Sequence, residues 1–245
     1  IVVCLIVAHL FFYYVCGNPS NFDAKGHPID NNIFGTLYQG GFVIPIVITL
    51  LLTVLALGVE RIVALHKASG KGKVADFVIQ AKELLRKGDL KATEELCDRQ
   101  QGSVANILKS ALVRYRDVEN RNDLTSDEKA SIVEKEIADT TALELPYMQQ
   151  NLNVIATISS LGTLFGLLGT VLGMIRSFGA MANEGAPDSI ALSLGISEAL
   201  MNTAMGITTG ALAIIVYNYF SSRVENITNA VDEVGFAIGQ TFKER

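Results

Sequence analysis

Residues 161–175 read LGTLFGLLGTVLGMI, an apolar run in which a glycine recurs at every third or fourth position. These spacings bring side chains to one face of a helix. In lipid, where no hydrophobic force draws helices together, a face of small residues lets two helix backbones approach closely. The face comprises Ser159, Gly162, Gly166, Gly169 and Gly173. The pattern predicts a membrane-spanning helix that packs tightly against a second helix.

The following apolar run repeats this pattern of small residues. Its small face comprises Ala199, Thr203, Gly206, Gly210 and Ala213. Two matching faces on consecutive helices predict tight packing, either within one hairpin or between neighbouring chains of a ring. Packing within one hairpin would account for the glycines without any further function.

Four apolar blocks, at residues 1–16, 42–59, 154–175 and 190–220, dominate the 245 residues. About 18 apolar residues are enough to cross a hydrocarbon core of ~30 Å, and three of the blocks reach that length. The first block is shorter. Its bulky aromatic residues and the absence of a small-residue cleavage site argue against a secretory signal. Because the chain opens inside this block, we expect a retained helix whose beginning is missing.

The positive charges predict which segments face the cytoplasm. Fourteen of the 20 lysines and arginines lie between residues 67 and 135. Cytoplasmic segments collect lysine and arginine, so this region is expected inside. The expected all-α, polytopic order is a transmembrane helix at 1–16, a periplasmic loop at 17–41, a transmembrane helix at 42–65, a cytoplasmic helical domain at 66–150, a transmembrane helix at 151–178, a periplasmic turn at 179–189, a transmembrane helix at 190–220 and a cytoplasmic C-terminal helix at 221–245.

Several function classes find no support in the sequence. The net charge is −5, and no basic patch with interleaved aromatic residues suggests nucleic-acid binding. Cys4, Cys16 and Cys97 show no metal-ligand spacing, and the three histidines are scattered. No phosphate-binding glycine loop or nucleophile motif is present. We therefore expect neither an enzyme nor a bound cofactor or metal.

The inner domain is expected to be wholly helical. Residues 74–87 and 103–118 carry apolar residues at helical spacing. Thr125, followed three residues later by Glu128, forms a capping box that begins the next helix. From there to Gly179 the only strong breaker is Pro146, so we expect one long helix with a kink at that proline. The last apolar block is likewise expected to continue as a helix towards residue 242.

Polar residues in the last two apolar blocks are the functional candidates. Thr163 and Thr170 lie seven residues apart beside the glycine face, and Thr203 lies on the opposing small face. A threonine can bond its own backbone, so these residues indicate either plain packing or a narrow polar lumen. Glu198 is the only acid in the two blocks, and an intramembrane acid is a functional candidate, although an interfacial position is an alternative. Asn202, one turn further on, is expected to hydrogen-bond Glu198.

Three stretches resemble the ExbB/TolQ/MotA proton-channel family, and ExbB and TolQ in particular. They are residues 166–173 (GLLGTVLG), 195–206 (GISEALMNTAMG) and 215–218 (IVYN). The resemblance covers roughly residues 42–242. The first block and the 17–41 loop depart from the family pattern of three membrane helices.

The resemblance implies a homopentamer in the inner membrane of a Gram-negative bacterium. Its last two membrane helices would line a pore that holds the single transmembrane helices of an ExbD- or TolR-like partner, whose aspartate carries the proton. Proton flow would then energise a TonB- or TolA-like protein. Thr170 and Thr203 match the family's pore threonines, and Glu198 matches its third-helix glutamate.

Three functions are therefore weighed. The first is a proton-driven ring that energises TonB-dependent outer-membrane transport. A TolQ-like envelope-integrity motor or a flagellar stator ring is the alternative within the family. A passive membrane scaffold, with Glu198 at the interface and no ion pathway, is the alternative of another class.

Overall fold

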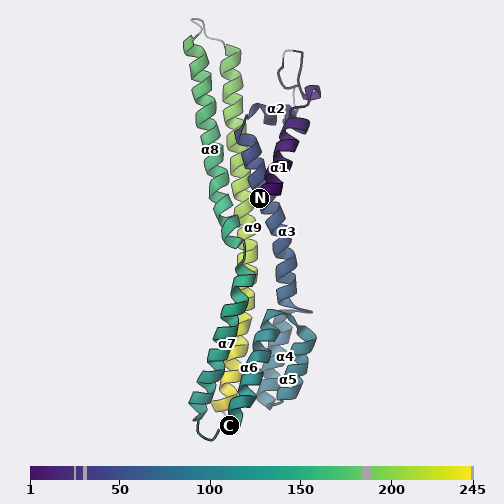
Figure 1. Ribbon diagram of the computed structural model, residues 1–245, viewed down its shortest axis with the longest axis vertical. Coiled ribbons are helices and arrows are strands. Elements are labelled where there is room, and N and C mark those ends of the chain that lie inside the picture. The colour runs from purple at the N-terminus through teal and green to yellow at the C-terminus, as the bar shows by residue number, and fades with distance from the viewer. Residues whose placement is uncertain (25, 30–31, 184–188, 244–245) are drawn as a thin grey trace. The chain divides into compact units, whose positions relative to one another are not determined.

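The computed structural model describes all residues except 25, 30–31, 184–188 and 244–245 (Figure 1). The elements in chain order are α1 (Val2–Leu10), a π-helical stretch (Phe11–Cys16), a 3-10 turn (Pro19–Asn21), α2 (Ile33–Gln39), α3 (Val43–Ser69), α4 (Val74–Lys87), α5 (Leu90–Gln100), α6 (Gly102–Glu119), α7 (Ser126–Gln149), α8 (Leu152–Asn183) and α9 (Ser189–Lys243). Within the described part of the chain, the one strand-like pairing is an isolated bridge between Phe22 and Pro28. The expected all-α class is confirmed.

The chain divides into two compact units. Unit 1 comprises Ile1–Val59 and Asn151–Asn218, and unit 2 comprises Glu60–Gln150 and Tyr219–Arg245. Three segments contain a helix long and apolar enough to cross a membrane: Val43–Lys87, Ser126–Gly179 and Leu192–Gln240. The helical run Val2–Cys16 is apolar but shorter.

In unit 1 the N-terminal segment packs on the helices that follow it. Ala8, Phe12 and Cys16 share a buried cluster with Leu37 and with residues of α3 and α9. Its aromatic contact is the ring of Phe12 stacked on Tyr38, with 4.9 Å between centroids. The segment 17–41, expected as a loop, contains a helix, because residues 33–39 form α2. Asn32 caps that helix by accepting hydrogen bonds from two backbone N–H groups of its first turn.

Unit 2 contains the helices predicted from apolar spacing. The expectation for 74–87 is confirmed by α4, and that for 103–118 by α6 with one additional residue at each end. Gly88 ends α4 in the left-handed conformation (φ 73°), where a residue with a Cβ is strained. The predicted capping box is confirmed: Thr125 Oγ1 accepts from the backbone of Glu128, whose carboxylate accepts from the backbone of Thr125.

The expected single helix from residue 126 to Gly179 is wrong. Pro146 lies inside α7, and the chain breaks later, where Asn151 adopts a left-handed conformation (φ 64°). Arg61 explains how α7 can end there. Its side chain is fully buried, and its guanidinium donates to the carbonyls of Tyr147 (3.0 Å) and Met148 (3.3 Å). A cation bonded to the last carbonyls of a helix stabilises the helix end. The expectation for the last helix is confirmed, since α9 continues without a break to Lys243.

Candidate functional site

The two small-residue faces meet within one chain, along the α8–α9 hairpin of unit 1 (Figure 1). A Cβ added to Gly206 would lie 2.6 Å from both the carbonyl oxygen of Gly162 and the Cα of Gly166. A Cβ on Gly162 would lie 3.2 Å from the backbone nitrogen of Gly210. Backbone therefore faces backbone, and only glycine permits this approach. Of the two arrangements left open by the sequence, the structure shows packing within one hairpin.

We call the contact between the two small-residue faces the glycine seam. Around Gly169 and Gly173 this seam contains side chains as well as backbone. A Cβ on Gly173 would lie 3.0 Å from the Cβ of Ala199. A Cβ on Gly169 would lie 2.5 Å from the Cβ of Asn202 and 2.7 Å from its amide nitrogen. Gly169 thus leaves the space that the Asn202 side chain fills.

Thr170 and Thr203 form a hydroxyl pair across the seam. Their Oγ1 atoms are within hydrogen-bond distance of each other, and both side chains are half-buried. The Thr170 hydroxyl lies 3.2 Å from the carbonyl of Gly166, and that of Thr203 lies 3.3 Å from the carbonyl of Ala199. A hydroxyl can donate one hydrogen bond and accept others, so the pair can transmit a hydrogen bond in either direction.

Glu198 makes an ion pair with Arg176 across the same hairpin. Arg176 Nη1 lies 2.6 Å from Glu198 Oε1, and the relative side-chain exposures are 51% for Arg176 and 15% for Glu198. The turn between α2 and α3 lies against this pair, because a Cβ on Gly41 would be 3.0 Å from Glu198 Oε1. Gly41 has a φ of +66°, so both its conformation and its proximity to the carboxylate favour glycine.

The expected hydrogen bond between Glu198 and Asn202 is wrong. The Asn202 side chain is 0% exposed, and within the described chain neither its amide nitrogen nor its oxygen has a hydrogen-bond partner. It lies between Gly169 and Gly40, whose added Cβ would be 3.0 Å from Asn202 Oδ1. Glu198 is bound instead by a guanidinium, which forms a stronger, charge-assisted hydrogen bond than an amide can.

Thr163 lies apart from the hydroxyl pair. It is exposed, and its hydroxyl is 3.4 Å from the carbonyl of Ser159, with Gly210 beside it on α9. The sequence interpretation missed the role of Arg176 as the partner of Glu198. Antiparallel helices place residues at equal distances from their connection opposite each other, and this register alone would have paired the two charges.

The described residues contain no group of three or more histidine, cysteine or acidic side chains that could hold a metal ion. The polar groups of the hairpin include instead the hydroxyl pair, one buried amide and one ion pair. These groups can pass or hold protons, but none is a nucleophile activated by a neighbouring base.

Comparison with known proteins gives a family match over this region. A family model described as the MotA/TolQ/ExbB proton channel family matches residues 100–233, which include the two small faces, the hydroxyl pair and Glu198.

Individual relatives are similar at modest identity. The biopolymer transport protein ExbB of Salmonella typhimurium is 25% identical over 169 residues, which cover 66% of this chain and 69% of the relative. A putative ExbB homolog of Methanothermobacter thermautotrophicus is 25% identical over 207 residues, 82% of this chain and 68% of the relative. The Tol-Pal system protein TolQ of Pseudomonas aeruginosa is 37% identical over 78 residues, 32% of this chain and 34% of the relative.

Proposed function

Because this chain belongs to the MotA/TolQ/ExbB proton channel family, we propose that it is the ring-forming subunit of a proton-driven motor in a bacterial inner membrane. With an ExbD-like single-span partner in its pore, the ring converts proton motive force into mechanical work. That work energises a TonB-like protein and, through it, outer-membrane transport. The family and the three long apolar helices together indicate a membrane protein.

The hydroxyl pair of Thr170 and Thr203 is the observation that carries the proposal. The pair lies within the apolar part of the hairpin, where the sequence offers no acid except Glu198. A hydroxyl can pass a hydrogen bond but does not itself ionise near neutral pH. A proton crossing at this level therefore needs a titratable group from another chain, and the carboxylate of an ExbD-like partner has the required chemistry.

The proposed ring uses surfaces other than the glycine seam. Since the seam is filled by the chain's own helices, contacts with neighbouring subunits and with lipid fall to the exposed apolar side chains. Those on α8 and α9 include Leu164, Leu167, Leu168, Val171, Ile175, Leu200, Ile207, Ile214 and Ile215. Large exposed apolar surfaces mark protein or membrane contacts. A homopentamer embedded in the bilayer would cover them.

In the proposed topology the lysine- and arginine-rich region at 66–150 and the end of α9 lie in the cytoplasm. The α8–α9 connection and the 17–41 segment then lie in the periplasm, and Glu198 lies near the outer edge of the membrane. Moving one charge through 100 mV of membrane potential yields about 2.3 kcal/mol, so a work cycle would use several protons.

A TolQ-like role in an envelope-integrity motor, with TolR- and TolA-like partners, is the second candidate. The similarity to the relative named TolQ supports it. The two roles differ in the partner, so the single-span protein that co-purifies with the chain identifies which one applies.

The test compares hydroxyls that are paired across the hairpin with one that is not. Thr170→Val and Thr203→Val each remove one member of the pair, and Glu198→Gln removes the acid. Thr208→Val is the matched control, because the Thr208 hydroxyl bonds only the carbonyl of Ala204 on its own helix (2.8 Å). Each variant is co-expressed with the partner in a strain lacking its own ExbB and TolQ, and growth that depends on motive-force-driven uptake is measured.

We expect the first three variants to lose most of this growth and the control to retain it. In reconstituted vesicles, the wild-type chain without a partner is expected to conduct protons poorly, because the pore then lacks the carboxylate. If Thr170→Val and Glu198→Gln both support growth at the wild-type level, the ring is a passive scaffold and the proposal fails.

A further inference from the structure

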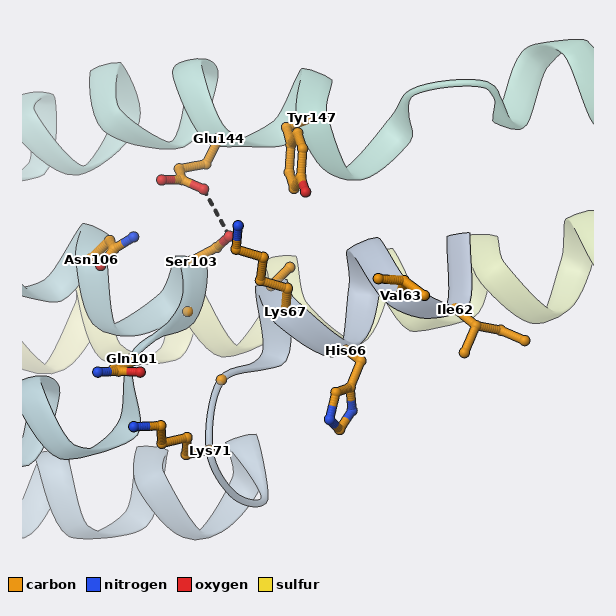
Figure 2. Close-up of a pocket in the computed structure, with 13 residues that line it drawn as sticks. Ile62, Val63, His66, Lys67, Lys71, Gln101, Ser103, Asn106, Glu144 and Tyr147 are labelled. Atoms are coloured by element: carbon orange, nitrogen blue, oxygen red, sulfur yellow. Dashed lines mark hydrogen bonds between the residues drawn. The ribbon is translucent and has the colours of Figure 1, made fainter. Parts of the chain in front are cut away.

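Unit 2 contains a pocket of about 710 Å³ beside the second half of α3 (Figure 2). Its walls come from three places: residues 62–71, the start of α6 and the last turns of α7. Its lining includes Ile62, Val63, His66, Lys67, Lys71 and Tyr147. The pocket does not involve the groups of the α8–α9 hairpin, and the proposed motor function does not use it.

The position of the pocket along α3 places it at the membrane surface. Counted from the start of α3 at Val43, 20 residues of continuous helix rise about 30 Å, the thickness of the hydrocarbon core, and end at Ile62. Their charged side chains are Glu60 and Arg61, which pair with each other. His66 and Lys67 lie four and five residues beyond that point, about 6 to 7.5 Å further along the helix, at the level of the lipid headgroups.

The side chains change character along the pocket in the same direction. Ile62 and Val63 are exposed (58% and 66%), and they lie at the end of the pocket nearer the hydrocarbon. Lys67 lies further along the pocket, beside the hydrogen-bonded pair of Ser103 and Glu144 (Figure 2). Tyr147, with an aromatic body and a polar tip, is of the type found at membrane interfaces.

The charge of the pocket suits an anion. Its lining contains Lys67 and Lys71 against a single carboxylate, Glu144, so the two lysines outnumber the acid. Both lysines are exposed. The Ser103 hydroxyl donates to Glu144 Oε2 at 2.7 Å, which occupies part of the carboxylate's capacity to compete for the lysines. Basic pockets at this level of membrane proteins bind anionic lipid headgroups.

We propose that this pocket binds an anionic phospholipid of the inner leaflet. The phosphate lies between Lys67 and Lys71, and the upper part of an acyl chain lies against Ile62 and Val63. The proposal commits to a lipid rather than a soluble phosphate, because a soluble anion would leave the exposed apolar end of the pocket without a partner. Such a lipid would link the helical domain to the membrane surface at the base of α3.

The test measures lipid retention by the intact complex. The full chain, with its partner, is placed in phosphatidylcholine nanodiscs containing a minority of phosphatidylglycerol, and native mass spectrometry counts the phosphatidylglycerol molecules retained per chain. Each lysine near an anionic surface contributes a factor of about five in affinity, so Lys67→Gln with Lys71→Gln should lower retention about twenty-five-fold. Arginine at both positions keeps the charge and should retain the lipid.

The matched control is Lys87→Gln with Lys91→Gln, which removes the same charge from exposed positions of the same domain outside the pocket. It should leave retention unchanged. An equal loss in the control would mean that net charge alone attracts the lipid, and it would overturn the proposal. Displacement of the lipid by inorganic phosphate would overturn it in favour of a soluble anion. A photoreactive residue introduced at position 147 tests whether a second copy of the chain occupies the pocket. Crosslinks between chains, together with no retained phosphatidylglycerol, would overturn the proposal in favour of that second copy.

Discussion

Gly206→Ala tests whether the two helices of the hairpin approach as closely as the structure shows. The added methyl group would lie 2.6 Å from the Gly162 oxygen and from the Gly166 Cα, whereas ordinary contact begins at 3.4 Å. Both neighbours are backbone atoms, so no side chain can rotate away. The helices must separate locally by about 0.8 Å, and this strains the hydroxyl pair one turn away at Thr203.

The magnitude follows from two opposing terms. Overpacking a close contact costs about 1–3 kcal/mol. Alanine is the better helix former by about 1 kcal/mol, which offsets part of that cost. Gly179→Ala isolates the second term, because Gly179 lies on α8 with nothing within 4 Å of an added Cβ. We therefore expect the Gly206 variant to be about 1–3 kcal/mol less stable than the Gly179 variant.

The assay is thermal unfolding of the purified protein in detergent, followed by far-UV circular dichroism, with motive-force-dependent growth as a second measurement. Gly179→Ala should melt at or slightly above the wild-type temperature and support growth. Gly206→Ala should melt earlier and support little growth. If the two variants melt together, the backbones do not approach as closely as described, and the account of the glycine seam is refuted.

Three further predictions concern single residues. Asn202→Leu, which keeps the size of the side chain and removes a buried amide without a partner in the described chain, should leave the melting temperature unchanged or raise it. Thr125→Ala should lower the stability of the helical domain by about 1 kcal/mol in denaturant titrations. Hydrogen bonds from the backbone and side chain of Thr125 hold the pKa of Glu128 below its usual value. The Glu128 carboxylate therefore stabilises the folded domain at pH values above the pKa that it has in the unfolded chain. The difference in stability between the wild type and the Thr125 variant should shrink as the pH falls through the lower pKa of Glu128 in the folded domain. Burial, with a smaller effect of Asp98, raises the pKa of Cys97 to about 12. In a variant whose other two cysteines are replaced by serine, Cys97 should therefore resist modification by maleimide at neutral pH until the domain is unfolded. Mass spectrometry of the treated protein measures this modification.

The hairpin was predictable because its information is local and periodic. Glycines three and four residues apart identify the helix and its packing face. In an antiparallel pair they also predict the register, since residues equally far from the connection face each other. Gly166 opposite Gly206 and Thr170 opposite Thr203 follow this rule. The capping box at Thr125 was predictable for the same reason, because both of its members lie within one turn.

The break after α7 was not predictable, because its cause is distant in the sequence. Pro146 is the obvious helix breaker, yet α7 continues through it to Gln149. The helix ends where the guanidinium of Arg61, 86 residues away from Tyr147, binds the terminal carbonyls. Asparagine adopts the left-handed conformation at little cost, so Asn151 permits the break. A single asparagine is too common in helices for its position alone to predict a break.

The partner of Glu198 could be found only from the register between the two helices, and not from the spacing along α9 alone. Glu198 and Asn202 are one helical turn apart, and spacing alone suggested a hydrogen bond between them. The residue that decides the pairing is Arg176 on the neighbouring helix. The turn at Gly40 and Gly41 closes over the same region, and its position depends on how α2 packs, which no local pattern contains.

The separation of the polar groups along α9 limits how protons can travel through this hairpin. Thr203 is five residues beyond Glu198, which corresponds to about 7.5 Å along a helix and exceeds the ~3 Å reach of a hydrogen bond. Asn202 lies between them in sequence, but its amide does not ionise, and it is buried against Gly169 rather than directed at either group. The Glu198 carboxylate and the hydroxyl pair are therefore too far apart to exchange a proton directly. In the proposed motor, a carrier between them would come from outside the hairpin, and this is the role that we assign to the carboxylate of the partner helix.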